Sequence, residues 1–489
     1  MRWLMADQLG PHFDDREDVL LIEAQAVLAR RPYHWAKAHL ILSALRHRAA
    51  ELGERARYVT AEHYRDVLIP LRDSGESLSV VNPTSWGSRA LVRELGLKIF
   101  PSRGFVSSED FFSSWAQGKK PGSLKLENYY RHWRDTSGVL MEGPLPAGGQ
   151  YNYDHDNRQP PPKGAANLGL PAPWEPVEDE IDAQVREDLT TWSREGKITL
   201  LGRDGPRRFA ATRQEALAAL ADFVETRLMD FGPFEDASLM GDDVMAHSML
   251  SVPLNLGLLH PQEVIDACVN AYDQGKAPLG SVEAIVRQIA GWRDWVWHLY
   301  WHLGEDYVQQ SNYLDAHVDL PQQFWDLDGE NVSAKCMSHV LKSVGDTGYA
   351  HHIQRLMILG NWSLQRGYNP AQLNDWFIDA FVDGTPWVMP ANVIGMSQHA
   401  DGGLVATKPY SSGGAYINSM SDFCSGCPFN PKVRLGENAC PFTAGYWAFL
   451  HRVEPRIRGN HRMAQPLAGM RKLADIDAVV EQETHRTSW

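Results

Sequence analysis

Short apolar runs alternate with helical patterns over the first hundred residues of this chain. Five runs are apolar enough and of the right length for strands in a parallel sheet, namely residues 2–6, 19–24, 56–61, 78–83 and 97–102. Between the second and third runs, Ala38, Ile41, Leu42 and Leu45 fall on one face of a predicted helix that ends at Gly53. Alternating strands and helices predict a doubly wound α/β domain, in which ligands bind at the carboxyl ends of the strands.

A different pattern begins after residue 117. Residues 118–180 are rich in Gly, Pro, Asn and Asp, with aromatic residues among them, and we expect a linker that packs against the rest of the protein. Beyond it, amphipathic helices bounded by Gly or Pro are predicted over residues 213–231, 261–275, 281–304 and 369–384. We therefore predict an α/β domain over residues 1–117, a linker over 118–180 and an all-helical domain over 181–489.

The composition of the 489-residue chain, with 43% hydrophobic and 22% charged residues, is typical of a soluble protein with large domain cores. The first ten residues lack the features of a signal peptide, and no run approaches the roughly eighteen apolar residues of a membrane span. We therefore expect a cytoplasmic protein without a membrane partner.

The net charge of −14 argues against a nucleic-acid partner, because a DNA backbone is itself negative. Basic residues are nevertheless clustered in two places. Six arginines and lysines follow His451 up to Lys472, and a smaller cluster occupies residues 203–208. Such clusters are usually solvated faces, but they are also the only places where this chain could neutralise phosphates.

Three of the five cysteines lie in the segment CSGCPFNPKVRLGENAC, residues 424–440, and the others are Cys268 and Cys336. A CxxC pair followed by a third cysteine has the spacing of a metal site that needs one more ligand. Four thiolates suit either a structural zinc ion or an iron–sulfur cluster, and a proline such as the one after Cys440 often follows a cluster ligand. The spacing leaves both metals open, together with the alternative of ordinary buried thiols.

Two further stretches carry residues suited to binding or catalysis. Ser248 and Ser251 lead into a predicted helix, where hydroxyls and free amides could hold a phosphate or simply cap the helix. His351 and His352 lie in an otherwise apolar helical segment. Adjacent residues point about 100° apart on a helix, so neighbouring histidines rarely bind one metal ion together. The functional interpretation is that one histidine donates a proton to a ligand in a pocket. The alternative is an ordinary buried histidine of the core.

The order of these segments resembles that of the photolyase–cryptochrome flavoproteins, which have an α/β antenna domain, a long linker and a helical FAD domain. The segments SMLSVPLNLGLL, VRQIAGWRDW, HHIQRLM and FVDGTPW look like the successive flavin-binding segments of that family. The segments AHHIQRLM, GMSQHADGGL, KPYSSGGAYINSMSDFCSGC and NACPF resemble its prokaryotic iron–sulfur branch, the bacterial (6-4) photolyases and their cryptochrome-like relatives.

The resemblance implies light-driven repair of (6-4) pyrimidine–pyrimidone photoproducts in UV-damaged DNA, by electron transfer from excited, reduced FAD. We expect the protein to act as a monomer. The alternative within the same architecture is a blue-light photoreceptor, a bacterial cryptochrome with little or no repair activity. A DNA-binding metalloprotein without photochemistry is a third alternative.

The match to the family also assigns roles to single residues. His352 would donate a proton to the lesion and His351 would orient it, while Tyr410 and Tyr416 would line the lesion pocket. The residues that would bind FAD are Ser248, Leu250 and Ser251 at the pyrophosphate, Arg293 beside the cofactor, Arg355 in the flavin-binding helix and Asp383 facing the flavin ring. A structural 4Fe-4S cluster would be held by Cys336, Cys424, Cys427 and Cys440, which leaves Cys268 as a core thiol.

Two further features of the family concern light capture and electron supply. Trp376 corresponds to the inner member of the family's electron-transfer chain and Trp325 to a second member, while Phe377 stands where a tyrosine is often found. The antenna pigment 6,7-dimethyl-8-ribityllumazine would bind at Asp7, Gln8, Glu23, His34 and Lys37. Ala6 departs from this pattern, because the family has a glycine there.

Overall fold

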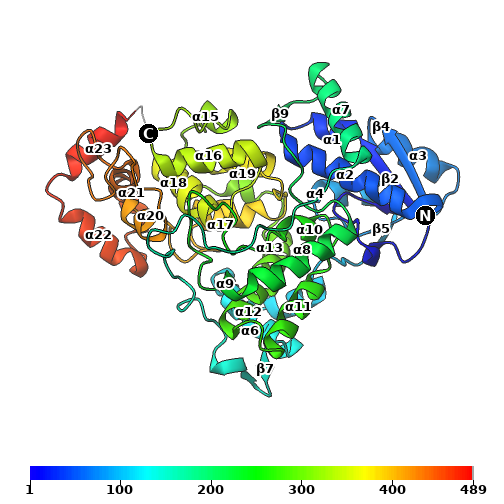
Figure 1. The fold of residues 1–489 in the computed structure, drawn as a ribbon, viewed down its shortest axis with the longest axis horizontal. Coiled ribbons are helices and arrows are strands. Elements are labelled where there is room, and N and C mark those ends of the chain that lie inside the picture. Colours follow the sequence, from blue (N-terminus) through cyan, green and yellow to red (C-terminus); the bar gives the residue numbers. More distant parts are fainter. Residues whose placement is uncertain (487–489) are drawn as a thin grey trace.

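The computed structural model describes residues 1–486, and its N-terminal domain contains a five-stranded parallel sheet (Figure 1). The strands, in the order β4-β2-β1-β5-β6 across the sheet, are β4 (Ala56–Ala61), β2 (Val19–Ala24), β1 (Arg2–Leu4), β5 (Ser79–Val81) and β6 (Lys98–Phe100). Trp3 in the central strand lies opposite Leu20 on one side and Val80 on the other. All five predicted strands are confirmed, and the chain winds outward from β1 in both directions.

The three inner strands, β2, β1 and β5, are buried along their whole length, which explains why they are mainly apolar. Trp3, Leu20 and Val80 face a core that also contains residues of α3 (Tyr64–Asp73) and α4 (Trp86–Glu94). On the other face, alternate residues of the strands pack against α2 (Trp35–Leu52) and against helices of the C-terminal region. The predicted end of α2 is also confirmed, because Gly53 has a positive φ of 55°.

The rest of the chain is mainly helical, as predicted (Figure 1). The helices that carry or surround the candidate site are α8 (Arg213–Thr226), α9 (Leu228–Phe231), α10 (Ser251–Asn255), α11 (Pro261–Asp273), α12 (Leu279–Val286), α13 (Asp294–Leu303), α15 (Gln322–Trp325), α16 (Lys335–Thr347), α17 (His352–Gln354), α18 (Asn361–Arg366) and α19 (Pro370–Ala380). The C-terminal helices are α20 (Gly414–Met420), α21 (Pro441–Ile457), α22 (Ala464–Arg471) and α23 (Ile476–Thr484), and α21 to α23 lie at the opposite end of the molecule from the sheet. One apolar core continues from the sheet into helices α8, α11 and α12.

Segments on both sides of residue 180 connect the two regions. Within the segment expected to be a linker, α6 (Leu126–Ser137) packs against the helical region. Chain that follows the linker also packs against the N-terminal domain. Helix α7 (Glu180–Arg194) packs against α2, and β9 (Leu200–Leu201) pairs in parallel with β3 (Tyr33–His34). The α/β domain therefore includes chain from beyond the expected linker.

Within residues 1–486, no helix combines the length and the apolar character that crossing a membrane requires.

Candidate functional site

Three π-helical stretches lie in the described part of the helical region, and two of them carry predicted FAD residues, Arg293 and Arg355. They are η5 (Arg287–Arg293), η6 (Arg355–Gly360) and η7 (Ala391–Ser397). The second and third pack so closely that a Cβ on Gly360 would lie 2.1 Å from Ser397 Oγ. π-helical turns are rare and are frequently found at functional sites, so their recurrence here singles out the centre of the helical region.

An ion pair joins two of the predicted FAD residues at this centre. Arg355 Nη1 and Nη2 donate to Asp383 Oδ1 and Oδ2 at 2.7 and 3.1 Å. The Ser251 hydroxyl also donates to Asp383 Oδ2, at 2.8 Å, and Asn255 Nδ2 donates to the Asp383 backbone carbonyl at 3.2 Å. The structure thus brings Ser251, Arg355 and Asp383 together and adds Asn255, which sequence reasoning missed although it lies one helical turn after Ser251.

Arg293 also contacts α10, the helix that carries Ser251 and Asn255. Its guanidinium donates to the carbonyl oxygens of Gly104 and Leu254, at 2.8 and 3.1 Å, and its Cζ lies 4.6 and 5.1 Å from the ring centres of Phe105 and Trp387. Burial lowers the pKa of Arg293 to about 10, which leaves it charged at neutral pH. Arg293 therefore fixes α10, the helix of Ser251, to the segment that follows the sheet.

The loop before α10 is strained. Met245 and Met249 both have a positive φ, of 52° and 56°, which is uncommon for residues other than glycine. Within the loop, Ser248 Oγ accepts a hydrogen bond from the backbone N–H of Leu250 at 3.4 Å. Backbone strain of this kind persists where the surrounding structure holds it, and it clusters at ligand-binding sites.

The two adjacent histidines have different surroundings. His351 is fully buried, its Nε2 lies 3.0 Å from Ser238 Oγ, and its ring stacks on that of His247 at 4.3 Å. His352 is exposed to solvent, yet the surrounding protein, with the Arg355 cation as a smaller cause, lowers its pKa to about 4. His352 is therefore the accessible member of the pair, and His351 is held in place behind it.

Sequence reasoning missed Ser238 and His247. His247 directly precedes Ser248, but nothing in the spacing of the sequence indicates that its ring stacks on His351. Burial lowers the pKa of His247 to about 3 and that of His351 well below its usual range, so both rings are neutral.

The predicted tyrosines lie near acidic residues that sequence reasoning also missed. Tyr410 is 39% exposed and Tyr416 is half-buried, and burial raises the pKa of both hydroxyls, so both keep their protons at neutral pH. Asp236 is the next cause of the raised pKa of Tyr416, which places this carboxylate near the tyrosine. Beside it, burial raises the pKa of Glu235 to about 8.

Part of the segment expected to be a linker lies beside Asp236, near the two tyrosines. Arg158 lies 2.9 Å from Asp154 and 3.8 Å from Asp236. Arg287 of η5 also pairs with Asp154. The linker segment is thus tied to the helical region beside the tyrosines, and only the aromatic residues within it hinted at such packing.

The four predicted metal ligands line one cavity. Cys336 at the start of α16 faces Cys424, Cys427 and Cys440 across this cavity, and Phe442 completes its wall. Burial, together with the other three thiols, raises the pKa of Cys336. A Cβ on Gly414 would lie 2.7 Å from Cys440 Sγ, so a side chain there would crowd the cavity. Cys268 lies elsewhere, in the core around α11, and burial raises the pKa of its thiol to about 12.

Trp376 is fully buried one aromatic ring away from the Arg355–Asp383 pair. Its ring centre lies 5.5 Å from that of Phe381, and Phe381 lies 4.4 Å from Arg355 Cζ. The indole Nε1 donates to the carbonyl oxygen of Phe324 at 2.7 Å. Trp325, at the end of α15, is half-buried and lies nearer the surface.

The structure does not bring all the predicted antenna residues together at one site. Asp7 and Gln8 lie just beyond β1, and Gln8 Oε1 has no hydrogen-bond partner in the described part of the chain. The Glu23 carboxylate is already bound by Arg46 and Tyr58. His34 Nε2 lies 3.2 Å from the Gly345 carbonyl, and Lys37 Nζ donates to the carbonyls of Ile378 and Gly384 at 2.5 and 2.7 Å. His34 and Lys37 thus contact the helical region.

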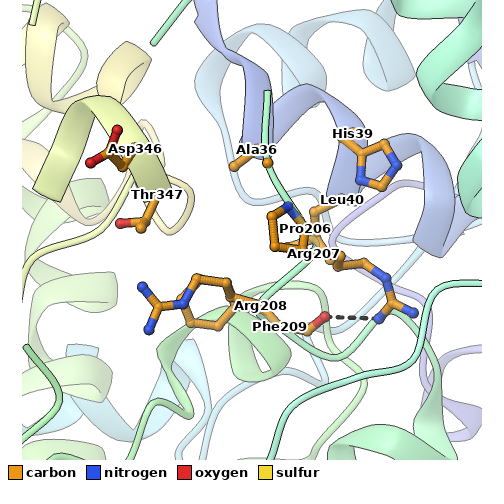
Figure 2. Close-up of a pocket in the computed structure, with 10 residues that line it drawn as sticks. Ala36, His39, Leu40, Pro206, Arg207, Arg208, Phe209, Asp346 and Thr347 are labelled. Atoms are coloured by element: carbon orange, nitrogen blue, oxygen red, sulfur yellow. Dashed lines mark hydrogen bonds between the residues drawn. The ribbon is translucent and has the colours of Figure 1, made fainter. Parts of the chain in front are cut away.

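A small pocket lies between α2, residues 205–209 and the end of α16 (Figure 2). It adjoins the smaller basic cluster of the sequence, but two of its three arginines have internal partners. Arg203 pairs with Asp346, and buried Arg207 binds both Asp182 and Glu215. Arg208 lines the pocket, and its side chain has no hydrogen bond or ion pair within residues 1–486. Two of the three arginines of this cluster therefore form contacts that stabilise the fold.

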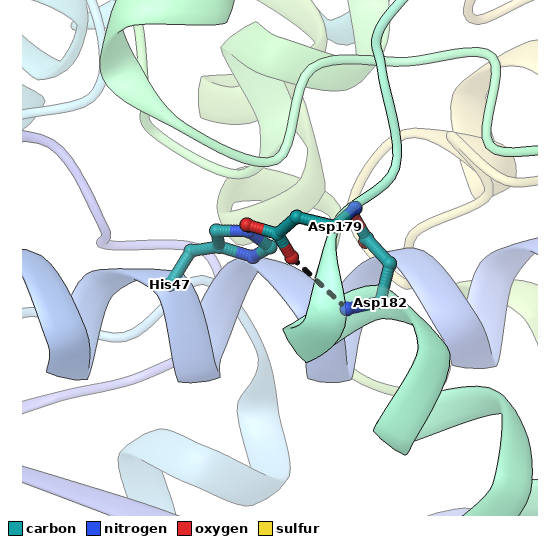
Figure 3. A group of neighbouring side chains, drawn as sticks. All are labelled: His47, Asp179 and Asp182. Atoms are coloured by element: carbon teal, nitrogen blue, oxygen red, sulfur yellow. Dashed lines mark hydrogen bonds and ion pairs between the residues drawn. The ribbon is translucent and has the colours of Figure 1, made fainter.

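His47, Asp179 and Asp182 approach one another where α2 meets the start of α7 (Figure 3). His47 Nε2 lies 3.1 Å from Asp179 Oδ2, and Asp179 caps α7 by accepting the N–H groups of Ile181 and Asp182. The Asp182 carboxylate is occupied by Arg207, at 3.0 and 3.1 Å. These groups already satisfy one another, so the arrangement joins two helices and is a poor metal site.

The larger basic cluster divides into internal and free residues. Arg452, Arg456 and Arg471 have partners within the protein. Arg458 and Arg462 are exposed and have no partner among the described residues. Asn460 Nδ2 donates to the Thr407 carbonyl at 2.9 Å, which ties this turn to the loop that carries Lys408 and Tyr410. Free cations therefore lie next to the exposed tyrosine.

Comparisons with known proteins agree with this arrangement. The family model described as deoxyribodipyrimidine photo-lyase-related protein matches residues 2–196, a range that ends just after α7. A (6-4) photolyase of Agrobacterium fabrum is 38% identical to this chain over 96% of the chain and 95% of that protein.

Two solved structures have the same fold along nearly their whole length. A bacterial class III photolyase from Agrobacterium tumefaciens has a TM-score of 0.56 at 15% identity, over 99% of this chain and 95% of that one. A Synechocystis cryptochrome has a TM-score of 0.57 at 12% identity, over 99% of this chain and 98% of that one.

Proposed function

This chain belongs to the photolyase–cryptochrome family, and we propose that it uses light to repair (6-4) pyrimidine–pyrimidone photoproducts in DNA. The proposal rests on one observation: His352 is accessible to solvent one helical turn before Arg355, whose pair with Asp383 lies at the centre of the helical region. The similarity to a protein named (6-4) photolyase supports the choice of lesion.

The residues around this centre fit a large polar cofactor such as FAD. Several buried polar atoms have no hydrogen-bond partner within residues 1–486, namely both amide atoms of Gln354, His351 Nδ1, His247 Nε2 and Arg293 Nε. Buried polar groups are normally hydrogen-bonded, so a set of unpartnered ones supports a ligand that would satisfy them. When bound, reduced and excited, FAD would supply one electron to the lesion.

Within this proposal, the protein holds FAD through a few groups. Asp383, oriented by Arg355, would face the flavin ring, Ser251 would bind at the pyrophosphate, and Arg293 keeps α10 in place. The strained loop at Ser248 and Leu250 binds the pyrophosphate through backbone N–H groups. Two carboxylate–guanidinium hydrogen bonds fix the orientation of Asp383 before any ligand arrives, which lowers the entropic cost of binding.

His352 would supply the proton that the lesion needs, because an electron alone does not return the transferred group to its original base. With a pKa of about 4, the His352 ring is neutral at physiological pH and donates through its N–H group. DNA phosphates or an anionic cofactor nearby would raise this pKa toward neutrality. His351, held by Ser238 and His247, fixes the backbone from which His352 projects.

A lesion can reach His352 only if it leaves the duplex, as in other enzymes that act on bases. Tyr410 and Tyr416 supply aromatic faces and protonated hydroxyls for such a flipped lesion. The unpaired cations Lys408, Arg458 and Arg462 lie beside Tyr410 and would neutralise phosphates on either side of it. This placement explains how a chain with a net charge of −14 could bind DNA.

We infer that the four cysteines hold a 4Fe-4S cluster, because all four thiols line one cavity and the resemblance to the iron–sulfur branch of the family assigns these residues to a cluster. The cluster would tie α16 to the segment before α21 and so stabilise the C-terminal region.

The proposal for a lumazine antenna has weaker support. Gln8 Oε1, just beyond the carboxyl end of β1, has no hydrogen-bond partner within residues 1–486, whereas Asp7, Glu23, His34 and Lys37 already have protein partners. We further propose that the protein acts as a monomer in the cytoplasm.

The proposal is tested by illuminating the reduced protein with oligonucleotides that contain one (6-4) photoproduct or one cyclobutane dimer. Loss of the (6-4) lesion in the light, but not in the dark, is expected. If the flavin is reduced and reoxidised in the light while both lesions persist, the protein is a photoreceptor and the proposed repair is wrong.

A further inference from the structure

A continuous series of buried aromatic rings begins at the Arg355–Asp383 pair. After Phe381 and Trp376, the ring of Phe324 follows at 5.0 Å from that of Trp376. The ring of Tyr368 lies 5.8 Å from that of Phe324. These rings belong to one apolar core, so the series is dry over its whole length.

The second half of the series ends at the cysteines. Trp362 donates its Nε1–H to the Tyr368 hydroxyl at 3.4 Å, and its ring centre lies 5.4 Å from that of Phe442. Phe442 and Cys440 line the same cavity. Trp362 and Tyr368 are only 1% and 7% exposed, so this route leads into the protein and not to solvent.

Two members of this series, besides Trp376, have side chains that one-electron oxidants can oxidise: Tyr368 and Trp362. Phenylalanine cannot serve in this way, and the residue that follows Trp376 in the chain is Phe377. We propose that Tyr368 and Trp362 form an inward branch of the electron-transfer chain, which connects Trp376 to the redox group held by the four cysteines.

The inference rests on the proposed function, since it requires a flavin that removes an electron from Trp376 in the light. Trp362 then gives one electron to the oxidised Trp376 and becomes a radical cation, while its Nε1 proton stays in the hydrogen bond to Tyr368. Trp362 would regain its electron from the iron–sulfur group, and a thiol in solution would return one electron to that group. Two such one-electron steps would oxidise two thiols to one disulfide and release two protons.

Arg366 controls how readily Trp362 is oxidised. Its Cζ lies 4.2 Å from the Trp362 ring, where a positive charge opposes the formation of a radical cation. Glu483 Oε2 lies 2.6 Å from Arg366 Nη1 and offsets this charge, and Arg366 Nη2 donates to the Pro441 carbonyl beside Cys440. The Arg366–Glu483 pair therefore lies where the branch meets the cysteine cavity.

The test compares Trp362→Phe and Tyr368→Phe, each in the parent and in a Trp325→Phe background. Trp295→Phe is the matched control, because Trp295 is equally buried but belongs to a different core cluster. Each FAD- and iron-loaded protein is illuminated in the oxidised form with a thiol. Flavin absorbance gives the rate of photoreduction, and electron paramagnetic resonance of samples frozen under light detects aromatic radicals and oxidised iron.

We expect Trp325→Phe to keep part of its photoreduction and Trp325→Phe/Trp362→Phe to lose it. The light-induced iron signal should disappear in Trp362→Phe and persist in Trp295→Phe. Tyr368→Phe removes a single oxygen atom, so it reports on the branch even if Trp362→Phe folds poorly, and it should weaken the iron signal.

The branch is wrong if both variants match the parent in rate and in iron signal. It is also wrong if the iron signal of the parent does not change in the light. If the parent shows the branch but repairs neither lesion, the proposed function fails and the inward branch stands. If the FAD-bound parent is not photoreduced at all, both fail.

Discussion

Arg355 grips Asp383 with both terminal nitrogens of its guanidinium, and the two side chains are only 14% and 9% exposed. If either side chain were removed, water could hydrate the remaining charge only poorly. Removing one partner of a buried pair costs far more than the pair contributes, because the remaining charge stays desolvated.

Arg355→Gln should therefore lose FAD and about 3 kcal/mol of unfolding free energy. The ratio of flavin to protein absorbance and urea unfolding check the two effects. Arg471→Gln is the control, because Arg471 is 57% exposed in its pair with Glu454 and such surface pairs contribute less than about 1 kcal/mol. Unchanged flavin content in Arg355→Gln would show that this pair does not face the cofactor.

Cys424→Ser should lose iron, whereas Cys268→Ser should keep it. Cys424 lines the cavity shared by four thiols, so its loss leaves a cluster with three ligands and open to solvent. Cys268 packs among apolar residues, and serine is close to it in size. Iron and zinc analysis of the purified variants checks this, and one zinc ion per chain without iron in the parent would refute the cluster.

Trp376→Phe should slow the photoreduction of FAD in the presence of a thiol. Phenylalanine fills much of the same space beside Phe324 and Phe381 but is much harder to oxidise. Flavin absorbance under blue light measures the rate. The variant should still repair lesions when its flavin is reduced chemically beforehand, and a rate equal to that of the parent would place the electron path elsewhere.

His352→Ala should abolish light-driven (6-4) repair while retaining FAD and most of the affinity for DNA, because affinity depends mainly on phosphate contacts. His351→Ala should weaken repair less, since His351 positions the donor. Lesion loss is followed by chromatography, and binding by titration of the labelled oligonucleotide. Repair at the parent rate in His352→Ala would exclude the proposed proton donor.

The apoprotein should lose stability as the pH falls from about 6.5 to 4. Burial lowers the pKa of His34 from 6.5 to about 4, so in this range the unfolded chain binds a proton that the folded chain does not. Stability is therefore complete above pH 6.5 and declines below it. His34→Gln should flatten the dependence of the melting temperature on pH; an equally steep profile would show that other groups cause the decline.

The strands could be predicted because burial on both faces of a sheet leaves short apolar runs in the sequence. The long helices could be predicted because burial on one face leaves apolar residues at helical spacing. Other relationships leave no such pattern. The amphipathic pattern of α7 shows that one face is buried but not that α2 covers it. Nothing near Cys336 indicates that it meets Cys424, and only the family resemblance joined them. Ser238 and His247 contact His351 although they are more than 100 residues away in the sequence, so sequence reasoning could not find them.

The pairing of β9 with β3, together with the contact of α7 with α2, limits how this protein can be taken apart. A designer who wished to exchange its N-terminal domain for that of a relative would naturally cut in the Gly- and Pro-rich segment before residue 180. Such a chimaera would part Leu42 and Tyr33 from Val185 and Leu189, with which they share a core. A junction after Leu201 keeps these residues together, so it is there that the chain can be recombined as two exchangeable modules.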